Sequence, residues 1–109
     1  VEDIIFYAKK LQDMGARNVL ISRGKDGALL ITENGEVLIS NVAKGNVINS
    51  VGAGDSMVAG FVAGYLNSNS YEEALKLGSA SGSATAFSSD LAKREFIDEL
   101  IKEIKIERR

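Results

Sequence analysis

The sequence predicts a small α/β domain with a mixed sheet that has an antiparallel hairpin at its edge. A helical pattern leads through a short loop into a β-rich run, which is half of a βαβ unit. Asn34-Gly35 lies between two apolar runs, as in a β-hairpin. From Gly54 onward the apolar residues recur at helical spacing. With 109 residues, the chain has the size of one domain.

The first half of the chain is predicted to form a helix, a strand and a hairpin. The expected elements are a helix over 2–14, strands over 18–22, 28–32 and 36–40, and a loop over 41–49. Gly15 follows the last apolar residue of the helical pattern and is typical of a helix end. Because the first strand follows a helix, we expect it to have a parallel neighbour. Asn34-Gly35 favours a type I′ turn in the hairpin.

The second half of the chain is predicted to be helical. The expected helices begin after Gly54 and end before Asn67, run over 71–87, and run over 93–106. Small residues recur along one side of the first of these helices and permit close packing: Ala59, Gly60, Ala63 and Gly64. Ser70, followed three residues later by Glu73, indicates a capping box at the start of the next helix.

Composition excludes several kinds of site. The chain has no cysteine and no histidine, which excludes disulfides, thiol nucleophiles, Cys/His zinc sites and Ser-His-Asp triads. A formal net charge of −2 gives no basic surface, so we expect no binding to nucleic acid or anionic membranes. No apolar run approaches the ~20 residues of a membrane span, and no signal-peptide pattern is present. We therefore expect a cytoplasmic protein.

The glycine-rich run NSVGAGDSMVAGF, residues 49–61, is the first candidate site. The amides of Gly52, Ala53 and Gly54 precede a helix, where free N–H groups and the helix dipole favour an anion such as a phosphoryl group. Asp55 allows two interpretations. It caps the helix, since Asp is favoured at the N-cap and in the first turn, or it accepts a proton from a hydroxyl that attacks the phosphoryl group. The local pattern leaves both open.

Two further segments also allow a structural and a functional interpretation. The segment Ser22 to Gly27 has turn composition, but a loop at the carboxyl end of a strand is also where α/β folds bind ligands. Its hydroxyl, amides and two cationic side chains suit nucleotide phosphates. The small-residue run Gly78 to Ala84 indicates either a helix packed tightly on a neighbour or a shallow floor for a flat ring such as adenine.

In combination, the segments SRGKDGALLI, NSVGAGDSMVAGF and KLGSASGSATAFS resemble the C-terminal part of the ribokinase-like (PfkB) sugar kinases. The resemblance covers essentially the whole chain and implies a three-layer α/β/α fold. Many family members carry Asp-Thr before the glycines, whereas Asn49-Ser50 stands here. This variant is similar to the phosphosugar branch, which contains 1-phosphofructokinase and tagatose-6-phosphate kinase.

The resemblance implies a role for each matching residue. Asp55 would be the catalytic base, and the amides of Gly52, Ala53 and Gly54 would form the anion hole for the transferring γ-phosphate. Residues expected to bind ATP are Ser22, Arg23, Gly24, Lys25, Asp26, Gly27 and Gly54, with Ala80 and Ser83 beside the adenine. Mg²⁺ would accompany ATP, but its nearer ligands in the family lie upstream of the matching segment, so no metal ligand is predicted here.

The resemblance also sets an expectation for the chain as a whole. Residues 1–109 are expected to be the single C-terminal, ATP-binding portion of a longer kinase and to be inactive in isolation. The expected acceptor is a ketohexose monophosphate, fructose 1-phosphate or tagatose 6-phosphate. Two alternatives stay open: a related kinase for ribose, a nucleoside or a hydroxymethylpyrimidine, and a non-catalytic nucleotide-binding or assembly domain. An isolated strand edge would favour self-association into a homo-oligomer.

Overall fold

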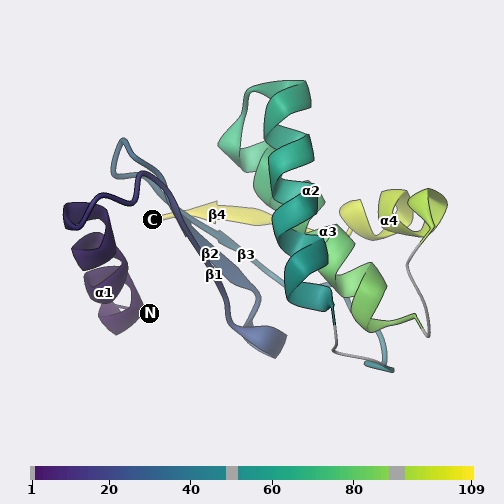
Figure 1. Cartoon of the computed structure of the whole chain (residues 1–109). Helices are drawn as coiled ribbons and strands as arrows, with labels where there is room; N and C mark the ends of the chain where they lie inside the picture. Colours follow the sequence, from purple (N-terminus) through teal and green to yellow (C-terminus); the bar gives the residue numbers. More distant parts are fainter. Residues whose placement is uncertain (1, 49–51, 89–92) are drawn as a thin grey trace.

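The computed structural model describes residues 2–48, 52–88 and 93–109. The predicted order of elements is largely confirmed (Figure 1). In chain order the elements are α1 (Glu2–Asp13), β1 (Val19–Ser22), the 3₁₀ turn η1 (Gly24–Asp26), β2 (Ala28–Ile31), β3 (Val37–Ser40), α2 (Ala53–Ser68), α3 (Tyr71–Ala86), α4 (Arg94–Ile101) and β4 (Ile106–Arg108).

The strands form one sheet in the order β1-β2-β3-β4. Every pairing within the described ranges is antiparallel, with Leu20 opposite Leu30 and Leu30 opposite Leu38. The parallel neighbour expected for β1 therefore has no counterpart among the described strands. Because β1 and β3 are both antiparallel to β2, they run in the same direction. Their carboxyl ends, at Ser22 and Ser40, consequently lie at the same edge of the sheet.

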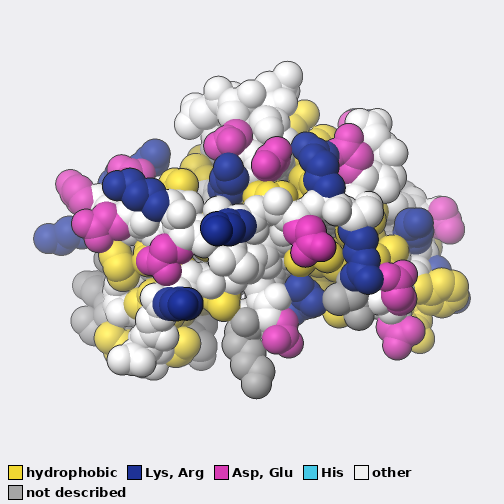
Figure 2. Space-filling view, turned by 180° about the vertical axis from the view of Figure 1, so that it is seen from behind, with side chains coloured by type: hydrophobic (Ala, Val, Ile, Leu, Met, Phe, Trp, Pro, Cys, Tyr) yellow, Lys and Arg dark blue, Asp and Glu magenta, His cyan; other side chains and the backbone are white. Residues whose placement is uncertain are grey.

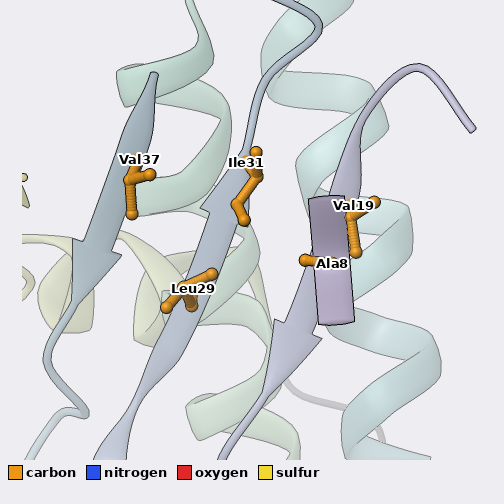
Figure 3. Packing of buried hydrophobic residues seen from close by; sticks show 5 residues of the cluster. All are labelled: Ala8, Val19, Leu29, Ile31 and Val37. Carbon is orange, nitrogen blue, oxygen red and sulfur yellow. The ribbon is translucent and has the colours of Figure 1, made fainter. Parts of the chain in front are cut away.

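Helices cover both faces of the sheet, α1 on one side and the α2–α3 pair on the other (Figure 1). Side chains of a strand alternate between faces, so β2 contributes to two separate clusters. Leu29 and Ile31 pack with Ala8 of α1, as Figure 3 shows, whereas Leu30 packs with Leu75 of α3. All four residues of β2 are buried. The arrangement confirms the predicted α/β fold.

Close packing of α2 on α3 confirms the prediction for Gly60 and Gly64, whereas Ala59 and Ala63 are exposed. A Cβ atom added to Gly64 would lie 2.9 Å from Cα of Ala74, and one added to Gly60 would lie 3.0 Å from the carbonyl oxygen of Leu77. Any side chain at these positions would force the helices apart. Ser70 caps α3 by accepting a hydrogen bond from the N–H of Glu73 at 3.3 Å, which confirms half of the predicted capping box. The N–H of Ser70 donates to Oγ of Ser68 at 3.2 Å.

The predicted type I′ turn of the hairpin is wrong in detail. Among the described residues with a positive φ, Asn69 is the only one that is not glycine, so Asn34 lacks the positive φ that a type I′ turn requires. Instead, Gly35 donates to Thr32 at 2.9 Å and has φ of 86°, and the N–H of Thr32 donates to Glu36 at 2.9 Å. This is a three-residue connection with glycine in the left-handed position.

The prediction of a helix over 93–106 is wrong at its C-terminal end, because α4 stops at Ile101. Asn41 provides the physical reason. Its side chain donates to the carbonyl of Glu103 at 2.9 Å and accepts from the N–H of Lys105 at 2.7 Å, so it satisfies backbone groups that a longer helix would pair internally. The chain then joins the sheet as β4, with Ile106 opposite Ser40.

Charged side chains of both signs are interspersed over one face of the molecule, without a large area of either sign (Figure 2). Within the described ranges, no helix is both long and apolar enough to cross a membrane. Large apolar side chains are exposed near both α1 and α2, including Met14, directly after α1, at 83% and Leu66 of α2 at 79%.

Candidate functional site

A cavity of about 390 Å³ lies at the edge of the sheet where β1 and β3 end. Its walls come from four segments: the turn after β1, the loop after β3, the first turn of α2 and one side of α3. The lining residues are Ser22, Gly24, Gly27, Ala28, Asn41, Val42, Ala43, Gly45, Val47, Ala53, Gly54, Met57, Ser79, Gly82, Ser83, Ala86 and Phe87. Carboxyl ends of strands are where α/β folds bind ligands, so this cavity is the candidate site.

The cavity brings together parts of all three predicted segments. It is lined by Ser22, Gly24 and Gly27 of the first segment, Ala53 and Gly54 of the second, and Ser83 of the third. Among the residues that the structure describes, no acidic side chain lines it. The wall is apolar with a few hydroxyl groups and one side-chain amide, which is typical of sites for small organic ligands.

Other predicted residues lie outside the cavity wall: Gly52, Arg23, Asp26, Asp55 and Ala80. Ala80 is fully buried in a cluster with Ala84, Leu100 and Ile104, so its position does not support a contact with a nucleobase. The side chain of Lys25 and the whole of Asn49 and Ser50 lie outside what the structure describes.

The turn after β1 is held by its own backbone. Arg23 donates through its N–H to the carbonyl of Gly27 at 2.7 Å, and Gly27 donates to Gly24 at 3.0 Å. The guanidinium of Arg23 donates to the carbonyl of Asp26 at 2.8 Å, while its Nε is buried and has no hydrogen-bond partner. Arg23 thus stabilises the turn rather than facing the cavity.

Gly27 is required by both space and conformation. Its φ of 88° and ψ of −151° fall in a region that essentially only glycine adopts. A Cβ atom there would also overlap the carbonyl oxygen of Ser40, the last residue of β3. The turn and the end of β3 can therefore approach each other only because residue 27 has no side chain.

The first turn of α2 begins at Gly52, which has a left-handed conformation with φ of 85°. Gly52 is the N-cap, and it has no side chain that could form a capping hydrogen bond. The interpretation of Asp55 as the N-cap is therefore wrong, although Asp55 does lie in the first turn, where the helix dipole stabilises a carboxylate. Because the N-terminal N–H groups of a helix lack intrahelical partners, the amides of this turn are available to an anion.

Asp55 is exposed and does not line the cavity, whereas its neighbour Gly54 does. Successive residues of an α-helix are rotated by about 100° around the helix axis. The carboxylate therefore leaves the helix beside the cavity instead of within it.

The loop after β3 is the part of the site that the sequence did not predict. It contributes Asn41, Val42, Ala43, Gly45 and Val47 to the wall. The N–H of Lys44 donates to the Glu103 carboxylate at 3.0 Å, and the N–H of Ile48 donates to Ala86 at 2.8 Å, so the loop is fixed at two points. The shared direction of β1 and β3 was the available signal, because it places both following segments at one edge.

Gly45 fits closely against the ring of Phe87, at the C-terminal end of α3. A Cβ atom on Gly45 would lie 2.6 Å from Cε2 of Phe87. The absence of a side chain at residue 45 therefore lets the loop lie flat on this ring. Phe87 and Met57 supply the largest apolar side chains of the wall.

No group of three or more Asp, Glu, His or Cys side chains that could hold a metal ion is found within residues 2–48, 52–88 and 93–109. The Mg²⁺ expected with ATP thus has no set of protein ligands in this part of the chain. The site as described offers backbone amides, hydroxyl groups and an apolar wall.

Two curated relatives match nearly the whole chain. It is 52% identical over 108 residues to 1-phosphofructokinase of Bacillus subtilis, covering 99% of this chain and 35% of that protein. It is 46% identical over 105 residues to D-tagatose-1-phosphate kinase of Bacillus licheniformis, covering 96% of this chain and 34% of that protein. The chain therefore spans about a third of the length of these relatives.

Solved structures match the fold equally well. A provisionally assigned phosphofructokinase from Staphylococcus aureus superposes with a TM-score of 0.94 at 40% identity, over 99% of this chain and 35% of that one. Arabidopsis thaliana ribokinase, solved with ribose and ATP, superposes with a TM-score of 0.83 at 24% identity, over 93% of this chain and 34% of that one. The second match shows that the fold is ribokinase-like.

A family model supports the same assignment. The model described as pfkB family carbohydrate kinase matches residues 1–94, which include β1, the hairpin, α2 and α3. The match thus contains both glycine-rich segments of the cavity and Asp55. The chain belongs to the pfkB family of carbohydrate kinases.

Proposed function

We propose that residues 1–109 are the ATP-binding portion of a phosphosugar kinase. One observation carries the proposal: the first turn of α2 and the turn after β1 line the same cavity, through Ala53, Gly54, Ser22, Gly24 and Gly27. Free amides at a helix start suit phosphate, and the apolar wall suits a nucleobase. Family membership supports ATP as the ligand.

The proposed reaction is phosphoryl transfer to a sugar hydroxyl. Asp55 accepts the proton of the attacking hydroxyl, whose oxygen forms a bond to the γ-phosphorus. The bond from the γ-phosphorus to the bridging oxygen breaks, and ADP leaves with that oxygen. The amides of Gly52, Ala53 and Gly54 stabilise the negative charge on the transferring group. In this reaction the nucleotide occupies the cavity and the acceptor contacts Asp55. The position of Asp55 beside the cavity supports this arrangement.

The proposed acceptor is a ketohexose monophosphate. Fructose 1-phosphate is the first candidate because the relative from Bacillus subtilis is a 1-phosphofructokinase. The D-tagatose-1-phosphate kinase from Bacillus licheniformis supports a tagatose phosphate as the second. In this proposal the walls of the described cavity bind the nucleotide, and none of the lining residues binds the sugar.

The proposal predicts that the isolated chain turns over no fructose 1-phosphate. Positioning of the acceptor supplies much of phosphoryl-transfer catalysis, and the chain spans about a third of its relatives. The same residues are expected to restore activity when they replace the matching segment of Bacillus subtilis 1-phosphofructokinase. The rate of ADP release in the presence of each sugar phosphate measures the activity of the isolated chain and of the chimaera. An inactive chimaera that still binds ATP would favour a non-catalytic nucleotide-binding domain.

We also propose that the isolated chain self-associates. β1 is one of the two outer strands of the described sheet and contains no charged residue or proline, the features that usually protect an edge. Size-exclusion chromatography over a range of concentrations measures this. Elution as a monomer at every concentration would contradict it.

A further inference from the structure

The N-terminal turn of α2 is held from outside by α3. Thr85 of α3 donates from its hydroxyl to Oγ of Ser56 at 2.8 Å, in a partly buried position. Ser56 itself closes the first turn, because its N–H donates to the carbonyl of Gly52 at 2.9 Å. The hydroxyl of Thr85 therefore reaches the residue that follows Asp55 and that is bonded to the N-cap.

A second contact presses the same turn against α3. A Cβ atom added to Gly82 would lie 3.1 Å from the carbonyl oxygen of Ala53 and 3.4 Å from Cβ of Met57. By contrast, a Cβ atom added to Gly54 would meet no atom within 4 Å. The turn is thus packed on α3 at one side and open at another.

This contact from α3 restrains a helix start whose N-cap residue cannot restrain it. A side-chain cap at the N-terminus typically contributes about 1 kcal/mol to helix stability, but Gly52 has no side chain to provide one. Because the first N–H groups of a helix lack intrahelical partners, contacts from a neighbouring helix help to hold this end in place. Thr85, which is 7% exposed, binds the side chain of Ser56 from the neighbouring helix. This hydrogen bond ties the first turn to α3 and leaves the N–H groups of the turn free.

We propose that Thr85 is a positioning residue. It acts through Ser56 to hold the amides of residues 52–54 and the carboxylate of Asp55 in a fixed position beside the cavity. The inference rests on the proposed function. Thr85 does not line the cavity, so its effect on a nucleotide is indirect. Its hydroxyl orients the turn, and the turn binds the phosphate.

Isosteric replacement tests the inference on the 109-residue chain. Thr85→Val keeps the shape of the side chain and removes the donor, and Thr85→Ser keeps the donor. We expect Thr85→Val to bind adenylyl imidodiphosphate, a non-hydrolysable ATP analogue, about five- to tenfold more weakly, as the loss of one hydrogen bond predicts. Thr85→Ser should restore most of the affinity. Isothermal titration calorimetry with MgCl₂ present measures both.

Gly64→Ala is the matched control, because it disturbs the same helix pair away from the site. A Cβ atom there would lie 2.9 Å from Cα of Ala74, a closer approach than at Gly82. Gly64→Ala should lower the melting temperature and leave the affinity unchanged.

Ser56→Ala removes the acceptor of the Thr85 hydrogen bond instead of the donor. In a double-mutant cycle, Ser56→Ala and Thr85→Val should lower the affinity by less than the product of their separate effects.

The outcomes separate this inference from the proposed function. If the unsubstituted chain binds no analogue, the proposed function fails and the inference fails with it. If the unsubstituted chain binds and Thr85→Val binds equally well, only the inference is overturned. The inference is also overturned if Gly64→Ala weakens binding as much as Thr85→Val, since general packing of α2 on α3 would then account for the effect.

Discussion

Asp55→Asn is expected to reduce phosphoryl transfer by about 10²–10⁴-fold, the usual contribution of a general base, while the affinity for ATP stays the same. Asparagine has nearly the same size as aspartate but cannot accept the proton of the attacking hydroxyl. Asp55 is exposed and does not line the cavity, so its loss should not disturb nucleotide binding. The measurement is kcat, with the ATP dissociation constant determined separately, in the chimaera with Bacillus subtilis 1-phosphofructokinase.

Glu99→Gln is a suitable control for the loss of one negative charge. Glu99 is exposed on α4, and its side chain does not line the cavity. It should change neither kcat nor the affinity for ATP. Unchanged turnover in Asp55→Asn would leave Asp55 with only its favourable interaction with the dipole of α2. An equal loss of turnover in both variants would indicate a general effect of charge.

Gly27→Ala is expected to have the largest effect on stability. The backbone conformation of Gly27 alone costs on the order of 1–3 kcal/mol for a residue with a side chain, and the added Cβ would overlap the carbonyl oxygen of Ser40. We expect a loss of about 3 kcal/mol or more, a large part of the 5–15 kcal/mol that typically stabilises a domain. Thermal unfolding followed by circular dichroism measures it.

Gly35→Ala is the matched control, because Gly35 also has a positive φ but has no atoms crowded around the position of a Cβ atom. Gly35 has a similar φ of 86°, but a Cβ atom there would meet nothing within 4 Å. Its replacement should cost only about 1–2 kcal/mol. If both variants lower the melting temperature equally, the close approach of the turn to β3 is not a determinant of stability.

Features that depend on residues close together in the chain could be predicted from the sequence. The hairpin, the cap at Ser70 and the small-residue contact between α2 and α3 follow from local patterns, and all are present. The location of the cavity at the carboxyl end of β1 was likewise expected. Turn composition and helical spacing act within a few residues, which is why a single sequence reveals them.

Features that depend on distant residues could not be predicted in this way. The apolar spacing of Ile97, Ile101 and Ile104 suits a long helix, but the side chain of Asn41 pairs with the backbone after α4 and redirects the chain into β4. The loop after β3 joins the site only because β1 and β3 share a direction. Ala80 and Ser83 belong to one helix, yet only Ser83 faces the cavity, because α4 packs over Ala80.

The central claim is that the start of α2 binds the phosphates of ATP. The most direct measurement is a titration of the ¹⁵N-labelled chain with adenylyl imidodiphosphate and MgCl₂, followed in ¹H–¹⁵N spectra. We predict large shifts of the amide signals of Gly52, Ala53 and Gly54, with further shifts in the turn over 22–27 and small changes in α1. Saturable binding that leaves the signals of residues 52–54 unmoved would contradict the claim.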